Sequence, residues 1–105
     1  MDKNARIDEL LKMVSQLPND PFPLYALGLE YLSSDNFDQA VHFFLQTEAK
    51  FPDYLPTFYQ LGNLFFKMDD VEKAKITFKK GIALAEKQTN RKTKAELEEA
   101  LFLLD

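Results

Sequence analysis

Few side chains in this 105-residue chain could take part in catalysis or metal binding. His42 is the single histidine, and no serine, aspartate or glutamate is placed by the sequence to orient it as a base. The absence of cysteine excludes disulfides, thiolate metal sites and a cysteine nucleophile. Three scattered glycines cannot form a glycine-rich phosphate loop. We therefore expect no catalytic residue, metal, cofactor or small-molecule substrate, and interpret His42 as a partly buried structural residue.

The charged residues are distributed unevenly along the chain, which has a net charge of −4. Residues 71–95 hold eight bases against two acids: Lys73, Lys75, Lys79, Lys80, Lys87, Arg91, Lys92 and Lys94. We interpret this basic block as a solvated helix face, with an acidic protein partner as the alternative. Nucleic acid is disfavoured, because no exposed aromatic residues alternate with the bases and the isoelectric point is near 5.0.

No run of about 18 apolar residues could span a membrane. The first eleven residues are charged and lack the apolar stretch of a secretory signal. A cytoplasmic protein without membrane contact is therefore expected.

Self-comparison reveals an internal repeat, in which segment 21–54 aligns on segment 55–88. Seven positions are identical: Tyr25/Tyr59, Leu27/Leu61, Gly28/Gly62, Asp35/Asp69, Ala40/Ala74, Phe44/Phe78 and Ala49/Ala83. About two matches would be expected between unrelated segments of average composition. A period of about 34 residues is typical of stacked helix pairs.

Helix signals divide each repeat into two helices. In the first repeat, Asp20 and Pro21 mark a helix to about Leu32, and Asn36 caps a second helix that ends near Lys50. In the second repeat, the corresponding helices are 56–67 and 71–87.

The flanking segments each predict one further helix. Apolar spacing predicts a helix over residues 5–17, and the capping box Thr93-Lys94-Ala95-Glu96 predicts the start of the last one. We therefore expect one all-α domain of six helices. It comprises an N-terminal half-repeat (1–19), repeat one (21–54), repeat two (55–88) and a C-terminal capping helix (93–105).

The residues at fixed offsets resemble the tetratricopeptide repeat family. They are Leu24, Leu27, Gly28, Tyr31, Ala40, Phe44 and Pro52 in the first repeat, and Phe58, Leu61, Gly62, Phe65, Ala74 and Phe78 in the second. The resemblance implies a right-handed α-solenoid of antiparallel helix pairs. Thr47 and Gly81 depart from the alanine usual in the family, and Glu86 replaces its terminal proline.

The first helix of each repeat carries a second apolar side in addition to its packing face. In the family, side chains at these offsets line a concave groove that binds a partner's peptide or helix. By this resemblance the groove candidates are Phe22, Tyr25, Leu29, Leu32, Tyr59, Asn63, Phe66 and Lys67. The alternative is that helix 93–104 or a second copy of the chain covers these residues.

The resemblance implies a non-catalytic protein–protein interaction module, an adaptor or scaffold, that binds a protein or peptide partner. The alternative is a self-associating structural module that forms a homodimer or larger homo-oligomer. The family's clamp for the carboxylate tails of chaperones is disfavoured. Only Asn63 matches its pattern, and Tyr25 and Tyr59 occupy the offset of the required lysine.

Overall fold

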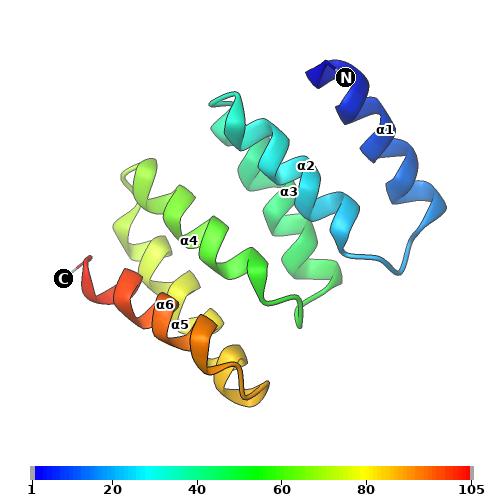
Figure 1. The fold of residues 1–105 in the computed structure, drawn as a ribbon. Helices are drawn as coiled ribbons and strands as arrows, with labels where there is room; N and C mark the ends of the chain where they lie inside the picture. Colours follow the sequence, from blue (N-terminus) through cyan, green and yellow to red (C-terminus); the bar gives the residue numbers. More distant parts are fainter. Residues whose placement is uncertain (1, 105) are drawn as a thin grey trace. The chain divides into compact units, whose positions relative to one another are not determined.

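The computed structural model describes residues 2–104, which form six α-helices and no strand (Figure 1). The helices are α1 (Lys3–Gln16), α2 (Phe22–Ser33), α3 (Phe37–Lys50), α4 (Pro56–Lys67), α5 (Val71–Lys87) and α6 (Arg91–Phe102). The predicted all-helical fold with six helices is confirmed. None of the described helices combines the length and the apolar character that a membrane span requires.

The six helices belong to two compact units, each described by itself. Unit 1 ends at Tyr54 and contains α1, α2 and α3; unit 2 begins at Leu55 and contains α4, α5 and α6. In unit 1, α2 packs against both α1 and α3, and in unit 2, α5 packs against both α4 and α6. Within each unit, consecutive helices run antiparallel (Figure 1).

Polar side chains cap four of the helices in the same way. The side-chain oxygens of Asp2, Asn36, Asp70 and Asn90 accept a hydrogen bond from the backbone N–H three residues later, at 2.8, 3.4, 3.1 and 3.1 Å. The predicted capping box at Thr93 is wrong as the start of the last helix. Because Asn90 satisfies the Thr93 N–H, α6 begins two residues earlier, at Arg91.

The start of α2 also differs slightly from the prediction. The helix begins at Phe22, one residue after Pro21, and Asp20 Oδ1 accepts a hydrogen bond from the Phe22 N–H at 2.9 Å. Asp20 thus pairs with a first-turn amide as expected, although Pro21 itself precedes the helix.

The core of unit 1 forms where α2 meets its two neighbours. Leu10 of α1 packs with Ala26 and Leu27 of α2. Phe44 of α3 is fully buried and faces Gly28. An ion pair between Arg6 and Glu30 further joins α1 to α2.

The core of unit 2 repeats the glycine–aromatic contact. Phe78 of α5 is buried and faces Gly62 of α4, while Leu97 anchors α6. In both units the phenylalanine ring thus occupies the space that a side chain on the glycine would need.

Candidate functional site

The α4 helix has one buried face and one exposed face. Phe58, Leu61 and Phe65 are buried in the core. Tyr59, Asn63 and Phe66 follow at intervals of four and three residues, which places them on one side of the helix. Their side is exposed: Tyr59 is 38% and Phe66 49% accessible. Exposed aromatic rings beside the side-chain amide of Asn63 form a surface suited to contact with another molecule.

The α6 helix approaches α5 closely because residue 81 is glycine. A Cβ on Gly81 would lie 2.7 Å from Phe58 Cβ and 2.9 Å from Leu97 Cδ1. Alanine, which is usual in the family at this position, would collide with both side chains. The glycine therefore lets α4 and α6 both pack on the same helix, α5.

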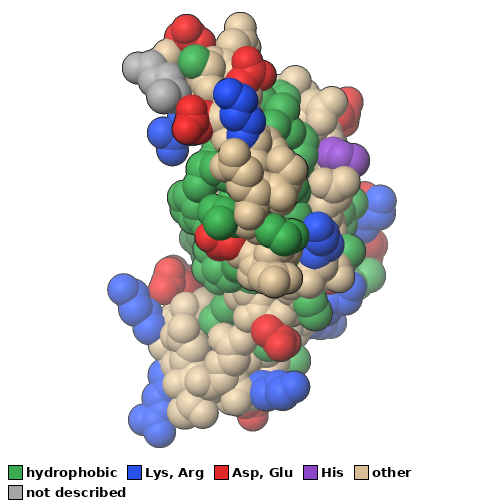
Figure 2. Space-filling model, turned by 90° about the vertical axis from the view of Figure 1, so that its right-hand side faces the viewer, with side chains coloured by type: hydrophobic (Ala, Val, Ile, Leu, Met, Phe, Trp, Pro, Cys, Tyr) green, Lys and Arg blue, Asp and Glu red, His purple; other side chains and the backbone are tan. Residues whose placement is uncertain are grey.

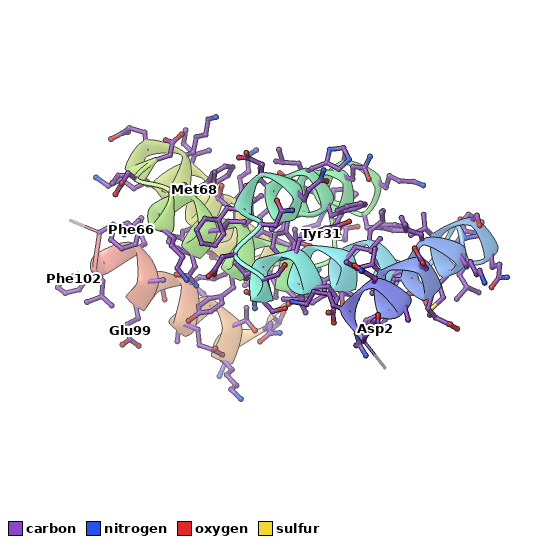
Figure 3. The ribbon with its side chains drawn as sticks, turned by 90° about the horizontal axis from the view of Figure 1, so that it is seen from above. Asp2, Tyr31, Phe66, Met68, Glu99 and Phe102 are labelled. Carbon is purple, nitrogen blue, oxygen red and sulfur yellow. The ribbon has the colours of Figure 1, made fainter. Side chains whose placement is uncertain are left out.

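Together α4 and α6 enclose a groove of about 260 Å³ within unit 2. From here on, "the α4–α6 groove" means the surface formed by Tyr59, Asn63, Phe66, Glu96, Glu99, Ala100, Leu103 and Leu104. Figure 3 shows Phe66 next to the end of α6 that carries Phe102, and Glu99 projecting from α6. The α4 wall is mainly aromatic, whereas the α6 wall is aliphatic with two carboxylates.

The charge of the α4–α6 groove has one sign. Glu96 and Glu99 lie about one helical turn apart and are both exposed, and no lysine or arginine is part of the lining. Lys94 of α6 forms an ion pair with Glu86 of α5 at 3.7 Å. A ligand in this groove would meet an apolar surface bordered by negative charge.

The predicted site residues of α4 are only partly brought together. Tyr59, Asn63 and Phe66 line the groove, but Lys67, exposed at the end of α4, is not part of its lining. The wall from α6 was missed, because that helix was interpreted as a cap. The spacing of the helices could have revealed this wall, since α2, α4 and α6 begin at nearly equal intervals along the chain. By this spacing α6 corresponds to the first helix of another repeat.

The other predicted site residues belong to α2 in unit 1. Phe22 is exposed, while Leu29 and Leu32 are half-buried. Tyr25 is also half-buried, and its ring contacts Phe44 and Tyr54 with centroid distances of 5.8 and 5.4 Å. A large part of the Tyr25 ring therefore serves packing within unit 1. A continuous groove that joins the α2 and α4 residues stays a prediction.

Next to Tyr25, unit 1 has a shallow pocket of about 360 Å³, lined by Pro21, Lys50, Phe51, Pro52, Asp53 and Tyr54. Burial raises the pKa of the Tyr54 hydroxyl above its ordinary value, and the negative charge of Asp20 raises it further. Both effects disfavour the phenolate, so Tyr54 stays a neutral hydrogen-bonding group well beyond neutral pH.

His42 lies elsewhere, on α3. The prediction that it is partly buried is wrong, since the side chain is exposed and its ring meets the Phe43 ring edge-on, with centroids 5.0 Å apart. Figure 2 shows this single histidine in purple at the surface. Its position in the repeat explains the error, because the equivalent Ile76 is likewise exposed on α5. No group of three or more His, Cys, Asp or Glu side chains among residues 2–104 is arranged to hold a metal ion.

Antiparallel helix pairs that recur at a constant period define a helical-repeat protein. The tetratricopeptide repeat family matches residues 55–88. The solution structure of a tetratricopeptide repeat domain protein from Salinibacter ruber is 35% identical, with 84% of this chain and 89% of that chain covered and a TM-score of 0.79. The crystal structure of a tetratricopeptide repeat domain protein from the same organism is 35% identical over 82% and 96% of the two chains, with a TM-score of 0.77.

The solution structure of a protein from Bordetella parapertussis shares the fold, with a TM-score of 0.79, 22% identity and coverage of 93% and 85%. No curated protein sequence matches the chain. The identity and coverage of the Salinibacter ruber structures establish the family: this chain belongs to the tetratricopeptide repeat proteins. The fold is in general that of a non-catalytic protein–protein interaction module.

Proposed function

We propose that this protein is a non-catalytic adaptor that holds a segment of a partner protein in the α4–α6 groove. The observation that carries the proposal is the exposure of Tyr59 and Phe66 opposite the aliphatic wall of α6. Large aromatic side chains are enriched in the residues that dominate binding energy at protein interfaces. An aliphatic or aromatic side chain of the partner would insert between Phe66 and Leu103, and Asn63 would hydrogen-bond to its backbone.

The experiment compares two substitutions of exposed apolar residues in unit 2. Phe66→Ala removes a groove wall, whereas Ile76→Ala removes a side chain of α5 that is 54% exposed and lies outside the groove. Short peptides are selected on the full chain from a random phage-displayed library, and their affinities are measured by fluorescence anisotropy. We expect Phe66→Ala to weaken binding at least tenfold and Ile76→Ala to leave it unchanged.

Helical circular dichroism verifies that both variants fold. Equal affinities for the two variants would contradict the proposed groove, as would a library from which no binding peptide emerges.

A second candidate function is self-association, which one feature of α6 favours. Phe102 and Leu103 are 76% and 71% accessible, and Phe66 and Met68 are also exposed (Figure 3). Apolar side chains exposed in this way often mark an interface between protein molecules. Light scattering over a wide concentration range tests this candidate: a dimer that dissociates on Leu103→Glu supports it, and a monomer at every concentration contradicts it.

A further inference from the structure

We propose that the α4–α6 groove selects a partner segment in which an apolar anchor residue stands next to lysine or arginine. This inference rests on the proposed function, since it names the chemistry of the ligand for the same groove. It follows from the types of residue on the two walls and at the rim.

The apolar part of the groove requires an apolar anchor. Phe66, Ala100 and Leu103 offer no hydrogen-bonding side chain, so a polar group inserted between them would lose its contacts with water without replacement. A leucine, methionine or phenylalanine of the partner would gain free energy by burial there. The volume of about 260 Å³ suits one or two such side chains.

The rim requires positive charge next to that anchor. Glu96 and Glu99 are separated by three residues on one helix, which is about 4.5 Å along its axis. Both carboxylates line the groove with no base among the lining residues. A basic side chain beside the anchor would therefore find a complementary potential, and an acidic segment would be repelled.

The chain's own basic regions fit this description less well. Residues 87–94 contain no apolar residue that could serve as an anchor. The exposed face of α5 has one, Ile76, with Lys73 and Lys79 three residues to either side. Within the basic block, a second copy could present only this isoleucine as an exposed large apolar side chain, which is a small anchor for a groove with two aromatic rings. Leu11 beside Lys12 and Met68 beside Lys67 are also exposed pairs of this kind. The net charge of −4 opposes the pairing of two copies, so a different protein is the favoured occupant and the second copy becomes an outcome of the test.

The probes are three short synthetic peptides of equal length, labelled with fluorescein. They share one pattern of leucines and differ only in the residues between them, which are all lysine, all glutamine or all glutamate. A fourth peptide keeps the lysines and replaces the leucines by serine. We expect the leucine–lysine peptide to bind the full chain at least tenfold more tightly than the other three.

The matched variants separate specific contacts from general attraction to an acidic protein. Glu96→Gln with Glu99→Gln removes the rim charges, while Glu98→Gln removes another exposed carboxylate of α6 that lies outside the groove. We expect the double substitution to weaken binding of the leucine–lysine peptide about three- to tenfold and to flatten its salt dependence. Glu98→Gln should change the affinity less than twofold.

Failure of this inference can be told apart from failure of the proposed function. If the three leucine peptides bind equally and all are weakened by Phe66→Ala, the groove is a binding site and the inferred preference for basic segments is wrong. If the leucine–lysine peptide binds equally to wild type and Phe66→Ala, the groove itself is wrong. If no peptide binds, the inference is contradicted. Self-association that is lost in both Ile76→Glu and Phe66→Ala would assign the groove to a second copy instead.

Discussion

The ring of Phe44 lies so close to Gly28 that a Cβ on this glycine would be 2.4 Å from ring atom Cε1. The relationship recurs in the second repeat, where a Cβ on Gly62 would lie 2.4 Å from Cε1 of Phe78. Both rings are buried, so neither can turn away into solvent. The absence of a side chain at each glycine therefore allows the two helices of a pair to approach as closely as they do.

Gly28→Ala tests this contact. Alanine is favoured over glycine by about 1 kcal/mol within a helix, but the added methyl group must displace the Phe44 ring in a closely packed core. Overpacking of this kind costs about 1–3 kcal/mol, and at this short distance we expect it to prevail. The free energy of unfolding should fall by up to about 2 kcal/mol, measured by urea denaturation followed by circular dichroism.

A second substitution provides the control for this prediction. Phe44→Leu removes the ring, so Gly28→Ala should destabilise the Phe44→Leu background less than it destabilises the wild type. If Gly28→Ala is stabilising in the wild type, close approach of the ring is not the reason for the glycine.

Substitution of Asn90 distinguishes the observed helix cap from the one expected from sequence. Asn90→Ala removes the oxygen that accepts the Thr93 N–H, so the free energy of unfolding should fall by about 1 kcal/mol. Thr93→Ala retains that backbone N–H and its partner, and should change the stability by less than about 0.5 kcal/mol. A larger effect of Thr93→Ala than of Asn90→Ala in thermal or urea unfolding would restore Thr93 as the cap.

Thr89 has a backbone conformation that favours glycine. Its φ is 55°, and a β-branched side chain is strained in this left-handed region. Thr89→Gly should therefore raise the free energy of unfolding by about 1 kcal/mol. Asp69→Gly is the comparison, because Asp69 has a φ of 65° but aspartate tolerates this conformation better. Equal effects of the two substitutions on the urea midpoint would contradict strain at Thr89.

Tyr54 should ionise above the ordinary pKa of tyrosine when the pH is raised. Ultraviolet absorbance follows the phenolates of the four tyrosines, and a late step that disappears in Tyr54→Phe would identify this residue. Burial is the first cause of the raised pKa and Asp20 the second, so Asp20→Asn should lower the pKa only in part. A late step unaffected by Tyr54→Phe would refute the assignment.

The raised pKa of Tyr54 also makes the free energy of unfolding depend on pH. The folded-state pKa of Tyr54 lies above its unfolded value of about 10. Its contribution to stability is therefore fully present below pH 10 and is lost as the pH rises through the folded-state pKa. Tyr54→Phe should retain more of its stability than the wild type once the pH exceeds that unfolded value, measured by urea unfolding.

The sequence alone determined the helices and their packing residues. The repeat period and the pattern of Gly28, Ala40 and Phe44 depend on contacts between neighbouring helices, which recur at constant spacing. Local signals such as Asn36 and Asp70 likewise act within one helical turn. For this reason four helices within the repeats were predicted to within about a residue at each end.

Tertiary structure decided which apolar residues remain exposed. Tyr25 and Tyr59 are identical in type and equivalent in the repeat, yet Tyr25 packs against Phe44 and Tyr54, whereas Tyr59 lines the α4–α6 groove. No periodicity distinguishes them, because the difference lies in what packs beside each ring. Tertiary packing also places the carboxylates of Glu96 and Glu99 in the groove. Gly81 lets α6 pack against α5 near Phe58, and only this packing brings α6 opposite Phe66.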